Sequence, residues 1–290
     1  RSQKTAECLR HLSEGGAKSF YDALQQIWLF HILSESIDCI QARSLGNLDQ
    51  LLYPFYRHDL ECGTFSDAEL REILHYFMYQ MAVLHYKWGH PFYLGGTDER
   101  GRCAVNELTW MILDVYEEAG IYDPKIQLKI SPDTPPDFLK RVLAMVRRGR
   151  NSVVFVGEPC ILRTMVRNGY TLEEARTADI KGCYEYTAQA AAVETAPFCI
   201  NSAKIISLAL GNGIDPDTGF NSGLRTGGSA ELVTFADFQN AAQKQFHSIG
   251  ERAMACANYF EPFLGEINPA LFFSAASARS LELGIDGYAR

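Results

Sequence analysis

The chain has 290 residues, of which 47% are hydrophobic and 21% are charged, and its formal net charge is −8. This composition is typical of a globular protein with a sizeable core, and the acidic balance excludes a nucleic-acid surface, which needs clustered lysine and arginine. No segment approaches the 18 uninterrupted apolar residues of a membrane-spanning helix. We therefore expect neither a nucleic acid nor a membrane as a partner.

The N-terminal half is predicted to be mainly helical. Helices are expected, in chain order, over residues 1–13, 16–36, 45–56, 67–86 and from about 103 to 118. Pro54 is expected to end the third helix, and Ser66 with Glu69 forms a capping box for the fourth. YLGGTDERG (93–101) is predicted to be a turn-rich loop, and it lacks the GxxxxGK[ST] pattern of a phosphate-binding loop.

The C-terminal half mixes strands with helices. Strands are predicted over 125–130 and 151–156, and helices over 136–149, 171–179, 201–210 and 234–260. Thr171 and Glu174 form a capping box, and residues 215–228 are rich in turn-forming residues. The sequence therefore predicts an α/β or α+β fold with more helix than sheet, and no low-complexity linker divides the chain.

The eight cysteines are scattered and include no CxxC pair. Their spacing fits no zinc site, so we expect no bound metal. A chain of this length does not need a disulfide framework, and we expect reduced thiols in a cytoplasm, most of them small core residues.

One cysteine has a distinctive neighbourhood, in KGCYEYTAQ (181–189). Cys183 follows a glycine, and Glu185 comes two residues later, so in an extended chain the thiol and the carboxylate would face the same side. That arrangement suits an enzyme with one sulfur-based step and one proton transfer. The spacing alone favours a buried cysteine beside an exposed glutamate, because a chain of this composition contains such a C-x-E pattern by chance.

Other candidates are a histidine, an asparagine and several aromatic residues. His90 lies in the predicted loop WGHPFYLGG and would face a cavity, although a structural hydrogen-bonding role is the alternative. The aromatic residues either line a pocket or pack in the core. The candidates for substrate binding are His90, Phe92, Phe155, Tyr184, Tyr186 and Asn201.

GCYE (182–185) resembles the Gly-Cys-x-Glu loop of the glycyl radical enzymes, the pyruvate formate-lyase-like group. Further segments resemble the family in the family's order, and together they span nearly the whole chain. They are SFYDALQQIWLFH (19–31), SLGNLDQLLYPFYRHDL (44–60), YLGGTDERGRCAVNELTWMILDV (93–115), PKIQLKISPDTPPDFLKRVL (124–143), NGYTLEEARTADIKGCYE (168–185) and NSAKIISLALGNGIDPDTG (201–219).

The resemblance implies a fold and a chemistry. The fold is a ten-stranded α/β barrel of two antiparallel half-barrels wrapped by helices, and residues 1–290 would be one partial domain from its centre, including the cysteine loop at about 181–189. By position, Cys183 would form the thiyl radical that takes a hydrogen atom from the substrate, and Glu185 would be the acid/base group. The activity implied is a radical elimination from a small substrate, with arylacetate decarboxylation as the alternative.

The resemblance also implies what the chain depends on. The glycyl radical lies in an Arg-Val-x-Gly-Tyr type motif, and Gly287 lacks the Arg-Val before it, so we expect the radical outside this chain. No bound cofactor is expected; a radical-SAM activating enzyme would install the radical in a homodimer of an anaerobic bacterium. Residues 1–290 alone would then be inactive. The rival hypotheses are a helical binding protein with an inert Cys183 and a decayed homologue that binds ligand without turnover.

Overall fold

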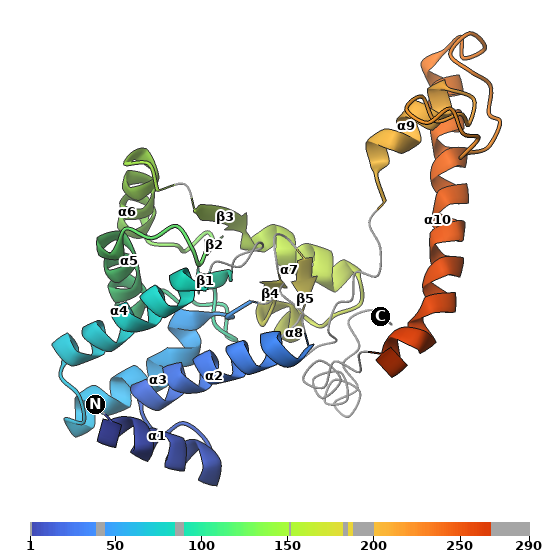
Figure 1. Cartoon of the computed structure of the whole chain (residues 1–290). Helices are drawn as coiled ribbons and strands as arrows, with labels where there is room; N and C mark the ends of the chain where they lie inside the picture. Colours follow the sequence, from blue (N-terminus) through green and yellow to red (C-terminus); the bar gives the residue numbers. More distant parts are fainter. Residues whose placement is uncertain are drawn as a thin grey trace. The chain divides into compact units, whose positions relative to one another are not determined.

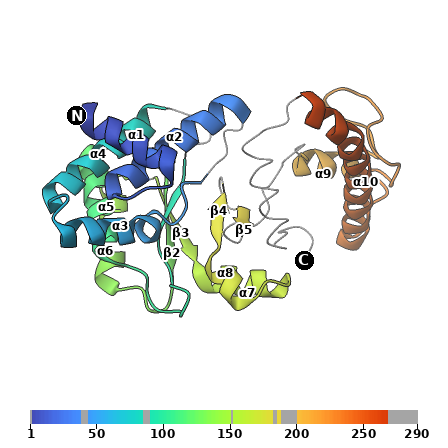
Figure 2. The same ribbon diagram turned by 90° about the horizontal axis from the view of Figure 1, so that it is seen from below.

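The computed structural model describes residues 2–38, 44–84, 90–150, 152–181, 185–187 and 200–267 (Figures 1 and 2). The chain forms two compact units. The first consists of Arg1–Val193 together with Ala270–Arg290, and the second consists of Glu194–Pro269. The helices of the first unit are α1 (Ser2–Glu14), α2 (Phe20–Asp38), α3 (Leu48–Cys62), α4 (Asp67–Val83), α5 (Glu107–Ala119), α6 (Pro136–Arg147), α7 (Glu158–Arg167) and α8 (Leu172–Arg176).

A parallel sheet organises the first unit. Its strands are β1 (Phe92–Gly95), β2 (Ile126–Ile130) and β3 (Val153–Gly157), in that spatial order. Helix α5 connects β1 to β2, and α6 connects β2 to β3, as parallel pairing requires. A second, antiparallel pair is formed by β4 (Asp179–Lys181) and β5 (Glu185–Thr187).

The two faces of the parallel sheet pack against different elements. Neighbouring residues on adjacent strands point to the same face, and successive residues on one strand alternate. Leu94 and Leu128 pair in register and belong to the main core, whose other side chains come largely from α2 to α6. Tyr93 and Val156 lie on the opposite face and belong to a second cluster with side chains of α7 and α8. One face of the sheet therefore belongs to the main core, and the opposite face packs against α7, α8 and the residues just before β4.

Several predicted elements are confirmed, including the strands at 126–130 and 153–157 and the caps of two helices. The hydroxyls of Ser66 and Thr171 each accept a hydrogen bond from the backbone N–H of the third helical residue, and the carboxylate of that residue accepts one from the backbone N–H of the capping residue. The predicted helix boundaries differ from the observed ones mainly near the ends, as for α4 and α6, which end at Val83 and Arg147.

The predicted end of a helix at Pro54 is wrong. Helix α3 continues through Pro54 to Cys62 and is closed by Gly63, which adopts a left-handed conformation with φ of 67°. Leu52 and Tyr56, on either side of the proline, are buried in the core. Tertiary packing of this face stabilises the helix beyond the local cost of the missing N–H.

The predicted loop over 93–101 is partly wrong, because its first residues form β1. All four residues of β1 are buried between strand β2 and the helices, and Gly95 and Gly96 then turn the chain with φ of 75° and 78°. The predicted helix from about residue 103 begins only at Glu107, with Asn106 as its cap. Helix α7 was not predicted.

The second unit consists of α9 (Ser202–Leu210), α10 (Phe235–Ile267) and the connection between them. Figure 1 shows α9 lying beside α10, with the connection folded over the first half of α10. Gln245 on α10 fastens this connection: its amide donates to the carbonyl of Leu224, and its side-chain oxygen accepts from the backbone N–H of the same residue. The predicted helices at 201–210 and 234–260 are confirmed, and the second extends to Ile267.

Candidate functional site

The two short strands β4 and β5 flank the predicted cysteine loop. They pair antiparallel, with Lys181 opposite Glu185 and Ile180 opposite Tyr186. Cys183 and Tyr184 lie outside the described residues, as does the side chain of Glu185. The backbone on both sides of Cys183 is thus held in one hairpin-like pair, and Glu185 is its first residue on the return strand.

A row of polar side chains lies on the sheet face that adjoins this pair. Gln127 and Lys129 of β2 are 1% and 3% exposed, and they share their face with Tyr93. The Lys129 ammonium donates a hydrogen bond to the carbonyl of Ala178, the residue before β4, and lies 5.2 Å from the centre of the Tyr93 ring. Buried polar groups on a parallel strand need such partners, because burial removes their hydration.

A buried carboxylate supports the end of β1. Asp49, in the first turn of α3, accepts hydrogen bonds from the backbone N–H of Gly95 at 3.0 Å and from the Thr109 hydroxyl at 2.7 Å. Burial raises the pKa of Asp49 to about 6, although these two donors and the positive charge of Lys129 oppose the rise. Asp49 therefore joins α3, α5 and β1 through one side chain.

Three buried side chains gather at the other end of β1. His31 and Glu35 lie one turn apart on α2, and His90 stands two residues before β1. The rings of His31 and His90 meet edge to face with centroids 4.2 Å apart, and burial lowers the pKa of His90 to about 4, so this imidazole is neutral at pH 7.

This cluster has the residue types of a metal site. One ligand atom from each of His31, Glu35 and His90 lies within 4.8 Å of the others. Ligands of a tetrahedral zinc ion at its usual bond lengths stand about 3.4 Å apart, so the cluster would have to contract to coordinate one. The same groups, a carboxylate and neutral imidazoles, are equally suited to hydrogen-bonding a small polar molecule.

The remaining predicted substrate-binding residues are not gathered in one place. Phe92 is fully buried in the main core, where its ring meets that of Tyr116 at 6.3 Å, and Phe155 shares the face of Leu128. Tyr186 lies on β5 and is 42% exposed. The placement of Phe92 matches the core alternative for the aromatic residues.

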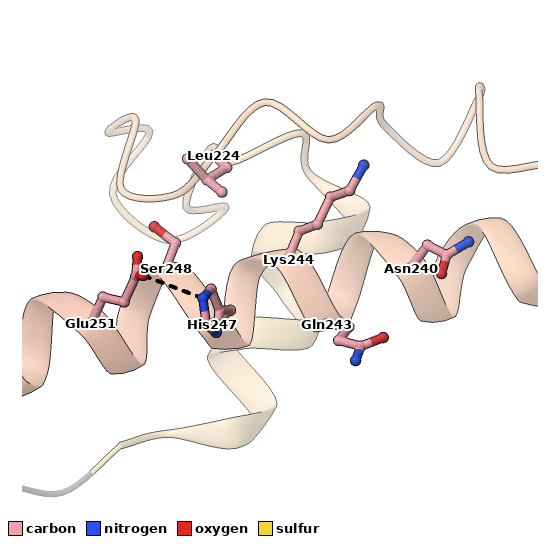
Figure 3. A pocket seen from close by; sticks show the side chains of 7 residues that line it. All are labelled: Leu224, Asn240, Gln243, Lys244, His247, Ser248 and Glu251. Atoms are coloured by element: carbon pink, nitrogen blue, oxygen red, sulfur yellow. Dashed lines mark ion pairs between the residues drawn. The ribbon is translucent and has the colours of Figure 1, made fainter.

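Asn201 belongs to the second unit and caps α9 through a bond from the Lys204 N–H. It borders a hollow of about 540 Å³ between α9 and α10. A second hollow, of about 430 Å³, lies along α10 (Figure 3). There His247 and Glu251 form an exposed ion pair at 3.2 Å. The other labelled side chains come from α10, except Leu224, which lies on the connection between α9 and α10. Neither hollow joins a nucleophile to an enclosed acid/base group among the residues that border it.

Five of the buried polar residues described above were not predicted from the sequence, namely Lys129, Gln127, Asp49, His31 and Glu35. The alternation of KIQLKI does place Gln127 and Lys129 on one face, but in an ordinary half-buried strand that face would be the solvated one. Both are buried here because a second layer covers the face, which a single strand's pattern does not reveal.

The fold and this row of polar side chains define a helix-rich α/β protein in which one face of a parallel sheet adjoins the residue that precedes β4. The family model described as pyruvate formate lyase-like matches residues 3–289. The chain belongs to this family, which confirms the resemblance to the glycyl radical enzymes.

The chain is 29% identical over 245 residues to trans-4-hydroxy-L-proline dehydratase of Clostridioides difficile, covering 79% of this chain and 31% of the relative. It is 26% identical over 234 residues to the glycyl radical subunit of 4-hydroxyphenylacetate decarboxylase from Clostridioides difficile, covering 73% and 25%. The chain therefore spans about a third or less of the length of these relatives.

A glycyl radical enzyme from Archaeoglobus fulgidus has a similar fold, with a TM-score of 0.81 at 23% identity, over 93% of this chain and 36% of that structure. The fold relationship thus extends over nearly the whole chain. In the described parts of the chain, no helix is long and apolar enough to cross a lipid bilayer.

Proposed function

We propose that this chain is the central part of a glycyl radical lyase that catalyses radical elimination from a small organic substrate. The observation that carries the proposal is the family match, which runs through Cys183 and Glu185 in GCYE. The parallel sheet and the β4–β5 pair would then belong to the ten-stranded barrel of the intact enzyme. The relatives include dehydratases and a sulfite-lyase, which supports elimination as the reaction class.

Cys183 is assigned the hydrogen-atom transfers. The thiol gives its hydrogen atom to the radical glycine, and the sulfur radical takes a hydrogen atom from a substrate C–H bond. After the elimination, the product radical recovers a hydrogen atom from the Cys183 thiol. These steps need an enclosed site, because water and oxygen divert radical intermediates.

Glu185 is assigned the proton transfer. A hydroxyl on the radical carbon of the substrate loses its proton to the Glu185 carboxylate. The bond between the neighbouring carbon and the leaving group then breaks, and the leaving group departs with the electron pair of that bond. A carboxylate in an enclosed site tends to have a raised pKa, which suits it to exchange protons near neutral pH.

His90 is assigned to the polar part of the substrate, together with His31 and Glu35 beside it. The neutral imidazole of His90 both donates and accepts hydrogen bonds, and the buried carboxylate of Glu35 accepts them. A hydroxyl or an amine would suit this cluster better than an apolar group, because imidazole and carboxylate side chains can exchange hydrogen bonds with it. Tyr184 and Tyr186 flank Glu185 and would shape the rest of the pocket.

Decarboxylation of an arylacetate is the second candidate, favoured by the likeness to the 4-hydroxyphenylacetate decarboxylase subunit. For either reaction, the intact enzyme would be a cytoplasmic homodimer of an anaerobic bacterium. A radical-SAM activating enzyme would install the radical on a glycine outside residues 1–290, so these residues alone would not turn over. A non-catalytic, ligand-binding homologue is the remaining alternative.

Two substitutions in the intact, activated enzyme test the assignment. Cys183→Ser should abolish turnover and leave the glycyl signal in electron paramagnetic resonance, because serine yields no comparable sulfur radical. Glu185→Gln should still exchange hydrogen between substrate and Cys183 but form no elimination product. The exposed Cys62 provides the control, and Cys62→Ser should retain activity. Turnover by Cys183→Ser would refute the thiyl assignment.

A further inference from the structure

We propose that Lys129 is a positioning residue that fixes the start of the strand leading to Cys183. This inference rests on the proposed function, and it assigns Lys129 a role in the same site. The carbonyl of Ala178, which accepts the Lys129 hydrogen bond, immediately precedes β4 and stands five residues before Cys183.

Lys129 is an almost fully buried lysine. Its residue is 3% exposed in the middle strand of the sheet, between Gly95 on β1 and Val156 on β3. Burying an ammonium group is costly, so its charge needs compensation from nearby groups. The carbonyl of Ala178, the face of the Tyr93 ring and the negative field of Asp49 provide it.

The chain makes room for this lysine with a glycine. A Cβ atom on Gly96 would lie 2.9 Å from Cβ and 3.0 Å from Cδ of Lys129, closer than side-chain carbons approach each other. Gly96 also has φ of 78°, which other residues rarely adopt. The turn after β1 is therefore shaped so that the Lys129 side chain can pass toward Ala178.

The segment that receives the hydrogen bond is anchored at Ala178 and just before it. Ala178 is 3% exposed and packs in the cluster of Tyr93 and Ala175. Two residues earlier, Arg176 donates to the hydroxyl of Thr97 at 3.1 Å, which ties the end of α8 to the turn after β1. Beyond Ala178 the chain enters β4, so the Lys129 hydrogen bond joins the middle strand of the sheet to the residue just before β4.

A hydrogen-atom transfer depends steeply on the position of the sulfur. A displacement of about 1 Å costs on the order of 100-fold in rate for well-oriented reactions. A side chain of similar shape but without the ammonium group would leave the Ala178 carbonyl without this donor and allow β4 to shift. Lys129 would thus act through the backbone of the cysteine loop, without touching the substrate.

The test uses Lys129→Met, which keeps most of the volume, and Lys129→Arg, which keeps the charge and the donor. In the intact protein, Lys129→Met should raise amide hydrogen exchange in 179–181 and 185–187 about tenfold, with exchange in β1 unchanged. In the activated enzyme, kcat should fall at least tenfold with KM changed less than about threefold. Lys129→Arg should restore both, and the exposed Lys140→Met should change neither.

Three outcomes would overturn the inference. In the first, Lys129→Met shows normal amide exchange in β4 and β5. In the second, exchange is faster in β1 as well, which reports a general loss of packing. In the third, Lys129→Arg behaves no better than Lys129→Met. Hydrogen exchange needs no turnover, so this result is separate from the fate of the proposed function. If Cys183→Ser retains turnover, the proposed function fails, while the exchange data still report whether Lys129 holds β4.

Discussion

Asp49 and Lys129 show how individual buried charges organise the site. Asp49 binds the end of β1 and Lys129 binds the start of β4, and each affects the other through its charge. The sequence predicts Cys183 and Glu185 as site residues from a short motif, because their proposed chemistry depends on residue types close together in the chain. Asp49 and Lys129 were missed because their partners are 46 and 49 residues away.

Asp49→Asn should change the pH dependence of stability. Folding raises the pKa of Asp49 from about 3.8 to about 6, so the folded protein holds a proton that the unfolded chain releases in this range. Ionisation of Asp49 therefore does not lower the free energy of unfolding below about pH 4. As the pH rises to about 6, it lowers the free energy of unfolding by up to about 3 kcal/mol. The asparagine oxygen can still accept from Gly95 and Thr109 but does not titrate.

The measurement is the unfolding free energy, or the melting temperature, of both proteins from pH 4 to pH 7. The stability of Asp49→Asn minus that of the wild type should increase with pH up to about 6 and then level off. Asp137→Asn, at an exposed carboxylate, is the control and should show no such trend. A difference independent of pH would mean that folding does not shift the pKa of Asp49.

At the scale of elements, local signals predicted some parts well and failed where packing overrides them. The capping boxes of α4 and α8 depend on residues three positions apart, and both are confirmed. Strand β1 was missed because Gly95-Gly96 resembles a loop, although its four residues are buried in the sheet. Helix α3 passes Pro54 because Leu52 and Tyr56 anchor it to the core. Long-range burial is the information that sequence periodicity lacks.

Gly96→Ala should be more destabilising than Gly63→Ala. Both glycines have positive φ, so each substitution costs about 1–2 kcal/mol for the backbone conformation alone. Nothing lies within 4 Å of a Cβ on Gly63, whereas a Cβ on Gly96 would meet Glu158 at 2.8 Å and Lys129 at 2.9 Å. Overpacking adds about 1–3 kcal/mol at Gly96.

The difference in unfolding free energy between Gly96→Ala and Gly63→Ala measures the cost of overpacking at Gly96. Gly96→Ala should also raise amide exchange in β4, because the methyl group displaces the Lys129 side chain from Ala178. Equal destabilisation by the two substitutions would show that the turn after β1 yields easily and does not direct Lys129.

At the scale of the whole molecule, sequence order predicted the family, because the motifs lie in the family's order along the chain, and the family model confirms it over residues 3–289. The sequence did not predict that one sheet face would carry the polar side chains, since that depends on which elements cover each face. The ten-stranded barrel, the dimer and the position of the radical glycine remain predictions.

The position of the radical can be tested in the intact protein. After anaerobic incubation with its radical-SAM activating enzyme, the protein should show the doublet of a glycyl radical in electron paramagnetic resonance. Gly287→Ala should leave this doublet at its wild-type amplitude, because we expect the radical outside residues 1–290, where an Arg-Val-x-Gly-Tyr motif can adopt the required loop. A glycine substitution in such a motif should abolish the doublet. Loss of the signal in Gly287→Ala would place the radical in GIDGYAR (284–290) and make this chain its carrier.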